Sequence, residues 1–284
     1  MDGFLIIDKS EGKSSAFIDS FIKKRFKASK VGHLGTLDPF ATGVLVIAVN
    51  AGTKAIPYIK SSTKIYDFEI TFGAKTDTSD KTGKVIEVSN KIPTVSEIQS
   101  VLPQFVGEIT QIPSIFSAIK VDGKRAYELA RKGEVPNMKS RKVTIYSLEL
   151  IGKNKFRAKV SPGTYIRSLT EDMAKALGTV GYTSYLRRIK DGKFSIEQSI
   201  TLENLEKMED NLDSVLIPLE NVLDDIPVIP VSCQDAGNLM LGRCISTAFV
   251  GESGQYLASA DNGFLEIVEF SDGVVYPKKL LKSF

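Results

Sequence analysis

The segment KIYDFEITFGAKT, residues 64–76, constrains the fold most, because apolar and polar residues alternate strictly along it. Tyr66, Phe68, Ile70 and Phe72 fall on one side of an extended chain, since successive side chains of a β-strand point to opposite faces. The segment therefore predicts a strand that is buried on one face and polar on the other.

Extended and helical patterns interleave along the first 200 residues without a regular strand–helix–strand repeat. Apolar or alternating runs predict further strands at residues 3–10, 44–49, 141–152 and 155–163. Apolar residues at helical spacing predict helices at residues 14–28, 94–103, 125–133 and 164–178. This mixture favours an α+β fold, built on a mixed, largely antiparallel sheet with flanking helices.

A change of composition near residues 216–232 predicts a domain boundary, because three prolines interrupt a polar stretch there. Beyond it, short apolar runs alternate with Asn-Gly and Asp-Gly pairs, which favour tight hairpin turns. We therefore expect a large domain at residues 1–225 and a small β-rich domain at residues 226–284.

The bulk composition is that of a water-soluble globular protein, with 42% hydrophobic and 25% charged residues in 284. The longest uninterrupted apolar run, residues 44–49, is too short to span a bilayer, and the first residues lack the basic start of a signal peptide. Cys233 and Cys244 are the only cysteines, which argues against a disulfide framework or structural zinc. A cytoplasmic location is expected.

The net charge of +3 is too small to indicate a nucleic-acid partner by itself, but the basic residues are clustered. The clusters comprise Lys23, Lys24, Arg25, Lys27 and Lys30, then Lys124, Arg125, Arg131 and Lys132, then Lys139, Arg141 and Lys142, and finally Arg187, Arg188 and Lys190. Acidic residues concentrate elsewhere, at 205–225. The basic clusters predict either one phosphate-binding face or several solvated helix faces.

The stretch KVGHLGTLDPFATGVLVIAV, residues 30–49, is the strongest candidate for chemistry. It contains His33, the only histidine, and Asp38, which is followed by a proline. Dinucleotide, phosphate-loop, nucleophile-elbow and metal-ligand motifs do not occur in the chain, and a single histidine disfavours a metal site or a serine triad. The segment DTSDKTGK, residues 77–84, is loosely like a calcium loop but is better interpreted as a polar hairpin turn. Carboxylate chemistry at Asp38, or an ordinary Asp-Pro turn, remain as the two interpretations.

Residues 30–49 closely resemble the central motif of the TruB-type pseudouridine synthases, which isomerise the T-loop uridine at position 55 of tRNA. Three more matching segments follow in the family's order: IYDFEITFGAKTDTSDKTG, SAIKVDGKRAYELARKG and GTYIRSLTEDMAKALG. The resemblance runs from Phe4 to about Thr201 and implies the pseudouridine synthase fold. The C-terminal segment is similar in position to the family's PUA-like RNA-binding domain, although it is short and its sequence match is weak.

The resemblance implies that Asp38 is the catalytic carboxylate, acting as nucleophile or base beside the sugar. It makes Arg167 the arginine that pairs with Asp38 and keeps it ionised. Tyr66 corresponds to the tyrosine that stacks on the flipped uracil, and Tyr165 and Leu186 complete the base pocket. Each of these three is otherwise interpreted as a core residue of a strand or helix.

His33 matches the family histidine that helps to open the T-loop, or it is a structural hydrogen-bonding residue. Candidates for RNA phosphate contacts are Lys9, Lys120, Arg125 and Arg141. The resemblance also implies that the enzyme needs no metal or other cofactor and binds the T-arm of tRNA. The compact chain favours an enzyme that works without an obligatory protein partner, and we expect a monomer.

Two other functions stay open on the residues alone. One is a tRNA-folding chaperone that uses the same pocket without essential catalysis. The other is a pseudouridine synthase that acts on other RNA, such as the guide-directed synthases, which have longer flanking regions. Nor does the sequence decide which atom Asp38 attacks or deprotonates.

Overall fold

The computed structural model describes residues 1–60 and 63–284. Its larger sheet has the strand order β14-β1-β3-β12-β4-β11-β10-β7, with β13 added to β12 and β2 added to β3. These strands are β1 (Gly3–Lys9), β2 (Val31–Leu34), β3 (Thr42–Val49), β4 (Lys64–Phe72), β7 (Gly107–Gln111), β10 (Arg141–Leu150), β11 (Lys155–Val160), β12 (Gly181–Asp191), β13 (Phe194–Ser195) and β14 (Ile200–Thr201).

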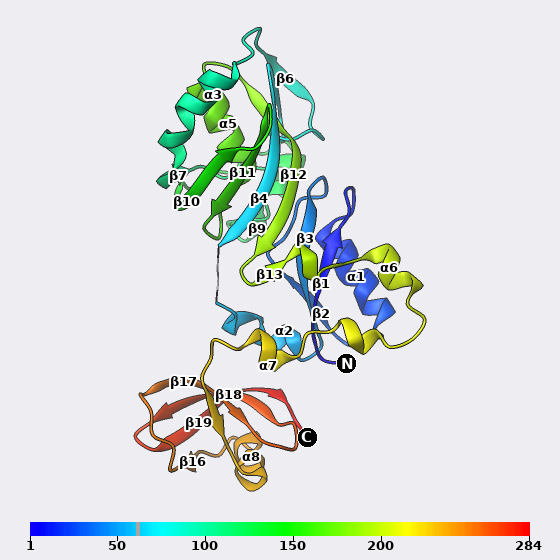
Figure 1. Cartoon of the computed structure of the whole chain (residues 1–284), viewed down its shortest axis with the longest axis vertical. Coiled ribbons are helices and arrows are strands. Elements are labelled where there is room, and N and C mark those ends of the chain that lie inside the picture. Colours follow the sequence, from blue (N-terminus) through cyan, green and yellow to red (C-terminus); the bar gives the residue numbers. More distant parts are fainter. Residues whose placement is uncertain (61–62) are drawn as a thin grey trace.

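Within the described residues, β1 with β14 and β3 with β12 are parallel pairs, and the other neighbours in this sheet are antiparallel. The helices are α1 (Ser15–Arg25), α2 (Gly52–Ala55), α3 (Val95–Val101), α4 (Ala126–Arg131), α5 (Ile166–Ala176), α6 (Leu202–Lys207), α7 (Leu219–Val222) and α8 (Cys233–Met240). The predicted fold class, a largely antiparallel mixed sheet with flanking helices, is therefore confirmed (Figure 1).

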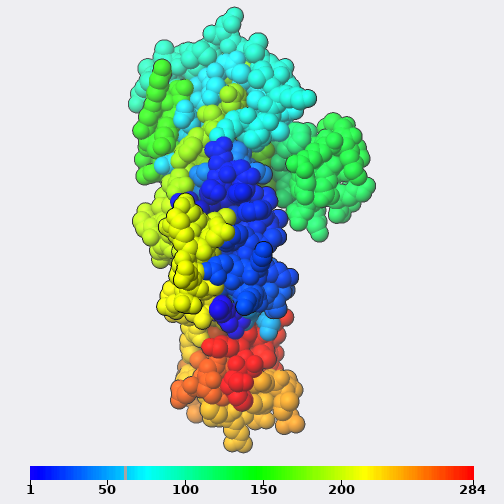
Figure 2. All heavy atoms as spheres, turned by 90° about the vertical axis from the view of Figure 1, so that its right-hand side faces the viewer, coloured from blue at the N-terminus to red at the C-terminus, as the bar shows by residue number. Residues whose placement is uncertain are grey.

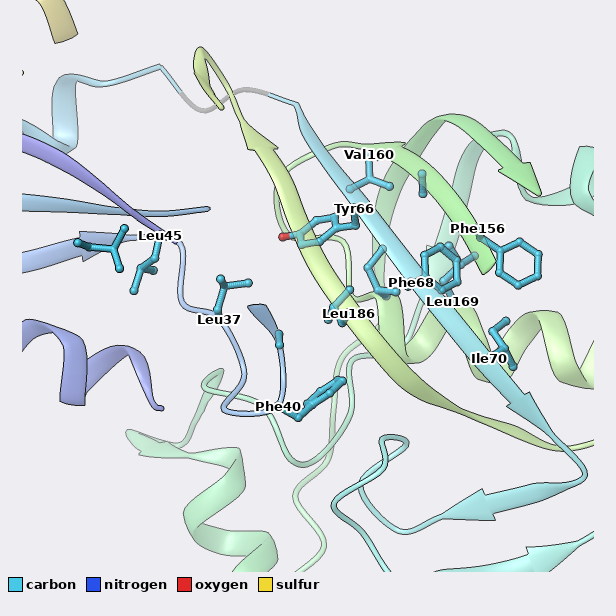
Figure 3. Packing of buried hydrophobic residues seen from close by; sticks show 14 of the residues in the cluster. Leu37, Phe40, Leu45, Tyr66, Phe68, Ile70, Phe156, Val160, Leu169 and Leu186 are labelled. Carbon is cyan, nitrogen blue, oxygen red and sulfur yellow. The ribbon is translucent and has the colours of Figure 1, made fainter. Parts of the chain in front are cut away.

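The alternating segment forms β4, and its apolar side chains are buried as predicted. Phe68 stacks on Phe156 of β11 with ring centroids 5.2 Å apart, and α5 covers the same face through Leu169 and Met173 (Figure 3). On the other face, Asp67 of β4 forms an ion pair with Arg157. One buried and one polar face explain the period of two in this segment.

The continuous apolar runs of β1 and β3 have a different cause, because this part of the sheet is buried on both faces. Leu5 and Leu45 pack into the cluster that includes α1. Phe4 and Val46 pack on the opposite side, against α7 and the C-terminal sheet. A strand that is covered on both faces has apolar side chains on both, so its sequence does not alternate between apolar and polar residues.

The C-terminal sheet has the strand order β15-β17-β18-β19-β16. Its strands are β15 (Val228–Pro230), β16 (Ile245–Ser246), β17 (Gly254–Ser259), β18 (Leu265–Ser271) and β19 (Val274–Lys282). One of its faces belongs to the same hydrophobic cluster as β3, α2 and α7, through Leu257, Leu265, Ile267 and Leu281. The division at residues 225 and 226 stays a prediction, since a shared core joins the two parts.

Two insertions leave the main sheet. The polar hairpin between β5 (Ala74–Thr76) and β6 (Val85–Val88) contains the DTSDKTGK turn, as predicted. The segment between β7 and β10 carries the small ribbon of β8 (Lys120–Val121) and β9 (Lys124–Arg125), followed by α4. In Figure 2 this green segment stands out to one side of the body. Within the described residues, the helices are all too short or too polar to cross a membrane.

Candidate active site

The loop between β2 and β3 presents Asp38. Its backbone forms a turn, because the carbonyl oxygen of Asp38 accepts a hydrogen bond from Ala41 N at 3.1 Å. Ser15, at the start of α1, fixes the preceding residue by bonding both the N–H and the carbonyl of Leu37. The Asp-Pro turn is therefore real, and it leaves the carboxylate of Asp38 free to face α5.

Arg167, in the first turn of α5, binds that carboxylate side-on. Its Nε lies 2.9 Å from Oδ2 of Asp38, and its Nη2 donates to Oδ1 at 3.1 Å. The guanidinium also donates to the carbonyl oxygens of Thr78 at 2.9 Å and Phe116 at 3.0 Å. Arg167 is only 3% exposed, so these contacts fix its orientation against solvent competition.

Asp80 also belongs to the site, although the sequence patterns do not single it out. It is buried, and its Oδ2 lies 3.5 Å from Nη1 of Arg167, on the side away from Asp38. The hydroxyls of Thr78 and Thr82 and the N–H of Thr82 donate to its Oδ1, which holds the carboxylate in place. Its segment was interpreted as a polar turn. The resemblance, which includes TDTSDKTG, was the available signal for a role in the site.

The charge of Asp38 is set by competing effects. Burial raises the pKa of its carboxyl above the ordinary aspartate value, and the nearby Asp80 adds to that rise. Arg167 and Lys9 favour the ionised form of the carboxyl and therefore oppose this rise in its pKa. The side chain is still 33% exposed, so substrate can reach the carboxylate that Arg167 holds.

A pocket of about 330 Å³ opens beside Asp38 and brings together six residues predicted from the sequence. They are Asp38, Tyr66, Arg141, Tyr165, Arg167 and Leu186. Figure 3 shows Tyr66 and Leu186 on the adjacent strands β4 and β12, with Leu37 and Phe40 on the Asp38 loop opposite them. Aromatic and apolar walls beside a carboxylate form a slot suited to a flat base.

Tyr165 is held at the rim of this pocket, immediately before α5. Its N–H donates to Oε1 of Gln111 at 3.1 Å, and its carbonyl accepts from Nε2 of the same side chain at 3.3 Å. The guanidinium of Arg141 lies over the Tyr165 ring, 4.6 Å from its centroid. A cation on one face of the ring limits where Tyr165 can move.

Two family models match consecutive parts of the chain. The TruB family pseudouridylate synthase (N terminal domain) model covers residues 23–166, and the tRNA pseudouridylate synthase B C-terminal domain model covers residues 167–224. A curated relative from Aquifex aeolicus, tRNA pseudouridine synthase B, is 40% identical over 99% of this chain and 100% of its own length. A relative of the same name from Zymomonas mobilis subsp. mobilis is 44% identical over 86% of this chain and 84% of its own.

The chain belongs to the TruB family. This confirms the family predicted from residues 30–49 and the class of enzyme, an isomerase that forms pseudouridine. A solved structure described as a Cbf5-Nop10-Gar1 complex contains a chain of similar fold, with a TM-score of 0.69 at 22% identity. The similarity covers 99% of this chain and 85% of that chain, so the likeness of fold includes the C-terminal sheet.

His33 of this TruB-family chain lies on β2, beside a second opening of about 400 Å³ that shares Asp38 and Arg167 with the base pocket. Its Nδ1 is 2.7 Å from Oδ2 of Asp19, and its Nε2 is 3.1 Å from Oγ1 of Thr36. These contacts hold His33 at the entrance of the site. Both predicted roles, opening of the T-loop and structural hydrogen bonding, stay predictions.

The four phosphate-contact candidates lie in different surroundings. Lys120 and Arg125 are exposed on the projecting β8–β9 ribbon, and Arg141 lines the base pocket. Lys9, by contrast, is 0% exposed and donates to the carbonyl oxygens of Ser10, Lys13 and Pro39 at 2.7–3.1 Å. Burial lowers its pKa to about 8. Lys9 therefore lacks the exposure that a phosphate contact requires, and it braces the turn after Asp38 instead.

Two further features bear on what else the fold can bind. A groove of about 820 Å³ between β6 and α5 is larger than the base pocket. Four carboxylates line it against two lysines, which disfavours phosphates there: Asp77, Glu87, Glu171 and Asp172, with Lys75 and Lys175. In the described residues, three or more His, Cys, Asp or Glu side chains are nowhere grouped as a metal site.

Proposed function

We propose that this protein isomerises uridine to pseudouridine at position 55, in the T-loop of tRNA, as a monomeric cytoplasmic enzyme without an obligatory protein partner. The observation that carries the proposal is the Asp38 carboxylate, held by Arg167 at the edge of a pocket with aromatic and apolar walls. The relatives are named as enzymes that act on tRNA, and a pocket suited to a flat base is consistent with such a substrate.

The reaction is an internal rearrangement, which fits a site built from side chains alone. The bond between the uracil N1 and the sugar C1′ breaks, and a bond between uracil C5 and C1′ forms. C5 loses a proton and N1 gains one, so the product has the atoms and electrons of the substrate. We propose that Asp38 supplies the nucleophile or base for this exchange, with no cofactor.

The target base must leave its stack before Asp38 can reach it. In the proposed complex the base lies in the slot between Tyr66 and Leu186, and Tyr165 closes its rim. Arg167 keeps Asp38 ionised and aimed at the sugar, because its two nitrogens occupy both carboxylate oxygens. His33, at the neighbouring opening, contacts the nucleotides that the base leaves behind.

The basic residues beside the site supply the sequence-independent part of RNA binding in this proposal. Arg141 lies at the base pocket and Arg125 at the neighbouring opening, so both can reach phosphates next to the flipped nucleotide. The exposed Lys120 extends this surface along the projecting ribbon.

The experiment that tests the proposal uses the purified protein and a T-arm hairpin RNA, with the modified position located in the product. Pseudouridine at the T-loop uridine, formed with multiple turnovers, is the expected result. Hairpins from ribosomal RNA, and a T-arm with the target uridine replaced by cytidine, serve as controls. Hairpin binding without any pseudouridine would leave the chaperone as the function. Modification of only the ribosomal hairpins would contradict the choice of tRNA.

A further inference from the structure

Arg188 is a buried cation beside the base pocket that the proposed chemistry does not use. It lies on β12, is 1% exposed and lines the pocket. Its Nε donates to the carbonyl oxygen of Val44 at 2.7 Å, and its Nη2 donates to that of Gly35 at 2.8 Å. In sequence it belongs to the basic cluster of Arg187, Arg188 and Lys190, but its burial excludes both a phosphate-binding surface and a solvated one at this position.

The position of Arg188 joins the two parts of the site. It lies directly opposite Tyr66 in the antiparallel register of β12 and β4, and opposite Gly43 where β12 meets β3. Gly35 and Val44 flank the loop that carries Asp38. One side chain therefore connects the strand of the stacking tyrosine with both ends of the catalytic loop.

The contact with Gly35 is close. Gly35 has a φ of +64°, which favours glycine, and a Cβ there would lie 3.2 Å from Nη1 of Arg188 and 3.1 Å from Nζ of Lys64. Asp191 partners both of these cations, with its Oδ2 3.5 Å from Nη1 of Arg188. The loop backbone thus rests directly on a braced guanidinium.

A buried guanidinium is costly unless its donors find acceptors, and an apolar side chain would fill the same space more simply. Here the acceptors are carbonyl groups at both ends of one catalytic loop. A planar fork with fixed angles determines where those carbonyls lie, which a flexible ammonium cannot do.

We propose that Arg188 is a positioning residue for the isomerisation, holding the Asp38 loop at a fixed separation from the Tyr66 ring across the base pocket. This inference rests on the proposed function. Because a misplacement of about 1 Å can cost roughly 100-fold in rate, losing the fork affects the chemical step much more than RNA binding.

The test compares Arg188→Lys with Arg187→Lys as a matched control. Arg187 is the next residue on β12 and forms a two-pronged ion pair with Asp8 at 2.8 and 3.0 Å, away from the pocket. We expect Arg188→Lys to lower kcat on the T-arm hairpin at least about 30-fold while KM stays within about 3-fold. Arg187→Lys keeps kcat within about 2-fold. Each kcat is normalised to the fraction of protein that binds the hairpin, so a partly unfolded sample does not imitate the effect.

A second variant, Gly35→Ala, reaches the same contact from the loop side. Its methyl group presses on Arg188 and Lys64 and moves the loop, so the same loss of kcat at unchanged KM is expected. Gly242→Ala is its control, because φ is +77° there and, in the described part of the chain, no atom lies within 4 Å of the added methyl. If Arg188→Lys does not fold, Gly35→Ala decides the question.

The outcomes separate the inference from the function beneath it. A wild-type protein that forms no pseudouridine in the hairpin contradicts the proposed function. An active wild type, with folded Arg188→Lys or Gly35→Ala variants that keep the wild-type kcat, overturns the positioning role. The same holds if KM alone rises.

Discussion

Arg167 binds both carboxylate oxygens of Asp38, through Nε at 2.9 Å and Nη2 at 3.1 Å. A guanidinium with two nitrogens this close to a carboxylate favours its ionised form and holds its direction. Since the arginine is buried and the aspartate is partly open to the pocket, only one partner of this pair can meet substrate.

Replacing Asp38 by asparagine should abolish pseudouridine formation while leaving RNA binding nearly intact. Asparagine keeps the size and the turn-forming ability of aspartate but lacks the charge and the nucleophilic oxygen. We expect a loss of at least about 10⁴-fold in single-turnover rate, about 5.5 kcal/mol of transition-state stabilisation. The rate is measured on the T-arm hairpin, and binding by filter retention.

The matched control for this variant is Asp67→Asn. Asp67 also forms a two-pronged ion pair, with Arg157 at 2.7 and 2.8 Å, but on the face of β4 away from the pocket. It should retain wild-type turnover. Substantial pseudouridine formation by Asp38→Asn would contradict the assigned chemistry.

Arg167→Lys should be a milder form of the same defect. A lysine keeps one positive charge near Asp38, but it cannot also satisfy the carbonyls of Thr78 and Phe116 or hold the carboxylate side-on. We expect a fall in kcat of roughly 100-fold, about 2.7 kcal/mol, with KM little changed. Steady-state kinetics check this, with Arg157→Lys as the control. A higher KM with an unchanged kcat would show that Arg167 serves binding instead.

The pH dependence of the rate should reveal the raised pKa of Asp38. In the proposed reaction Asp38 acts as the ionised carboxylate, so the rate should fall on acidification with a midpoint above the usual aspartate pKa of about 3.9. The contribution of Asp38 to the stability of the fold depends on pH in the opposite direction to the rate. Because the pKa of Asp38 is higher in the folded state than in the unfolded state, Asp38 stabilises the fold at pH values below its unfolded-state pKa. This stabilisation is lost as the pH rises through its folded-state pKa.

Single-turnover rates and thermal melting temperatures across that pH range test both statements on the same protein. The melting temperature of Asp38→Asn near neutral pH should not lie below that of the wild type. A rate profile that stays flat down to the pKa of a free aspartate would be the contrary result.

Lys9 and Arg141 should respond differently to neutralisation, although both were phosphate candidates. Lys9→Met removes the ammonium donor from the carbonyls of Ser10, Lys13 and Pro39, of which Pro39 keeps the N–H of Gly12 as a donor at 2.8 Å. It should therefore lower the free energy of unfolding by about 2 kcal/mol without altering the salt dependence of RNA binding. Arg141→Gln should do the reverse, reducing the slope of log affinity against log salt by about 1. Urea unfolding and a salt titration of hairpin binding measure the two effects. An unchanged slope for Arg141→Gln would return that residue to a structural role beside Tyr165.

Activity should persist in excess chelator, because the proposed rearrangement is performed by side chains. The assay compares turnover of the T-arm hairpin with and without EDTA, after ultraviolet melting has shown that the RNA stays folded in both buffers. Loss of turnover that a divalent ion restores would refute this prediction.

The sequence indicates the position of the candidate site best where a local pattern places the residue. Asp38, Tyr66 and Arg167 lie in contiguous motifs, and each comes from an element whose place is set by its own pattern: a turn, an alternating strand and the start of a helix. The pocket assembles because β4 and β12 are neighbours, so Tyr66 and Leu186 line it together although 120 positions separate them.

What the sequence did not predict depends on burial by distant segments. Asp80 is in a polar turn that any hairpin can carry, and only the approach of α5 makes it a partner of Arg167. Lys9 and Arg188 lie in basic or loop-forming stretches of sequence, where a cation is expected to be exposed. In the folded protein both are buried, because distant segments supply carbonyl groups that accept their hydrogen bonds. Burial of a charged residue is a property of the assembled sheet and cannot be inferred from its neighbours in sequence.

The hydrophobic cluster that joins β3, α2 and α7 to the C-terminal sheet also fixes the distance between the base pocket and that sheet. Two bodies joined by a packed core cannot change their separation as two bodies on a free linker do. An RNA that touches both the base pocket and the C-terminal sheet must therefore offer its target uridine at one fixed distance from its second point of contact. An RNA stem that is a few base pairs too long or too short would reach only the base pocket or only the C-terminal sheet. The enzyme would therefore select its substrate partly by the length of the stem.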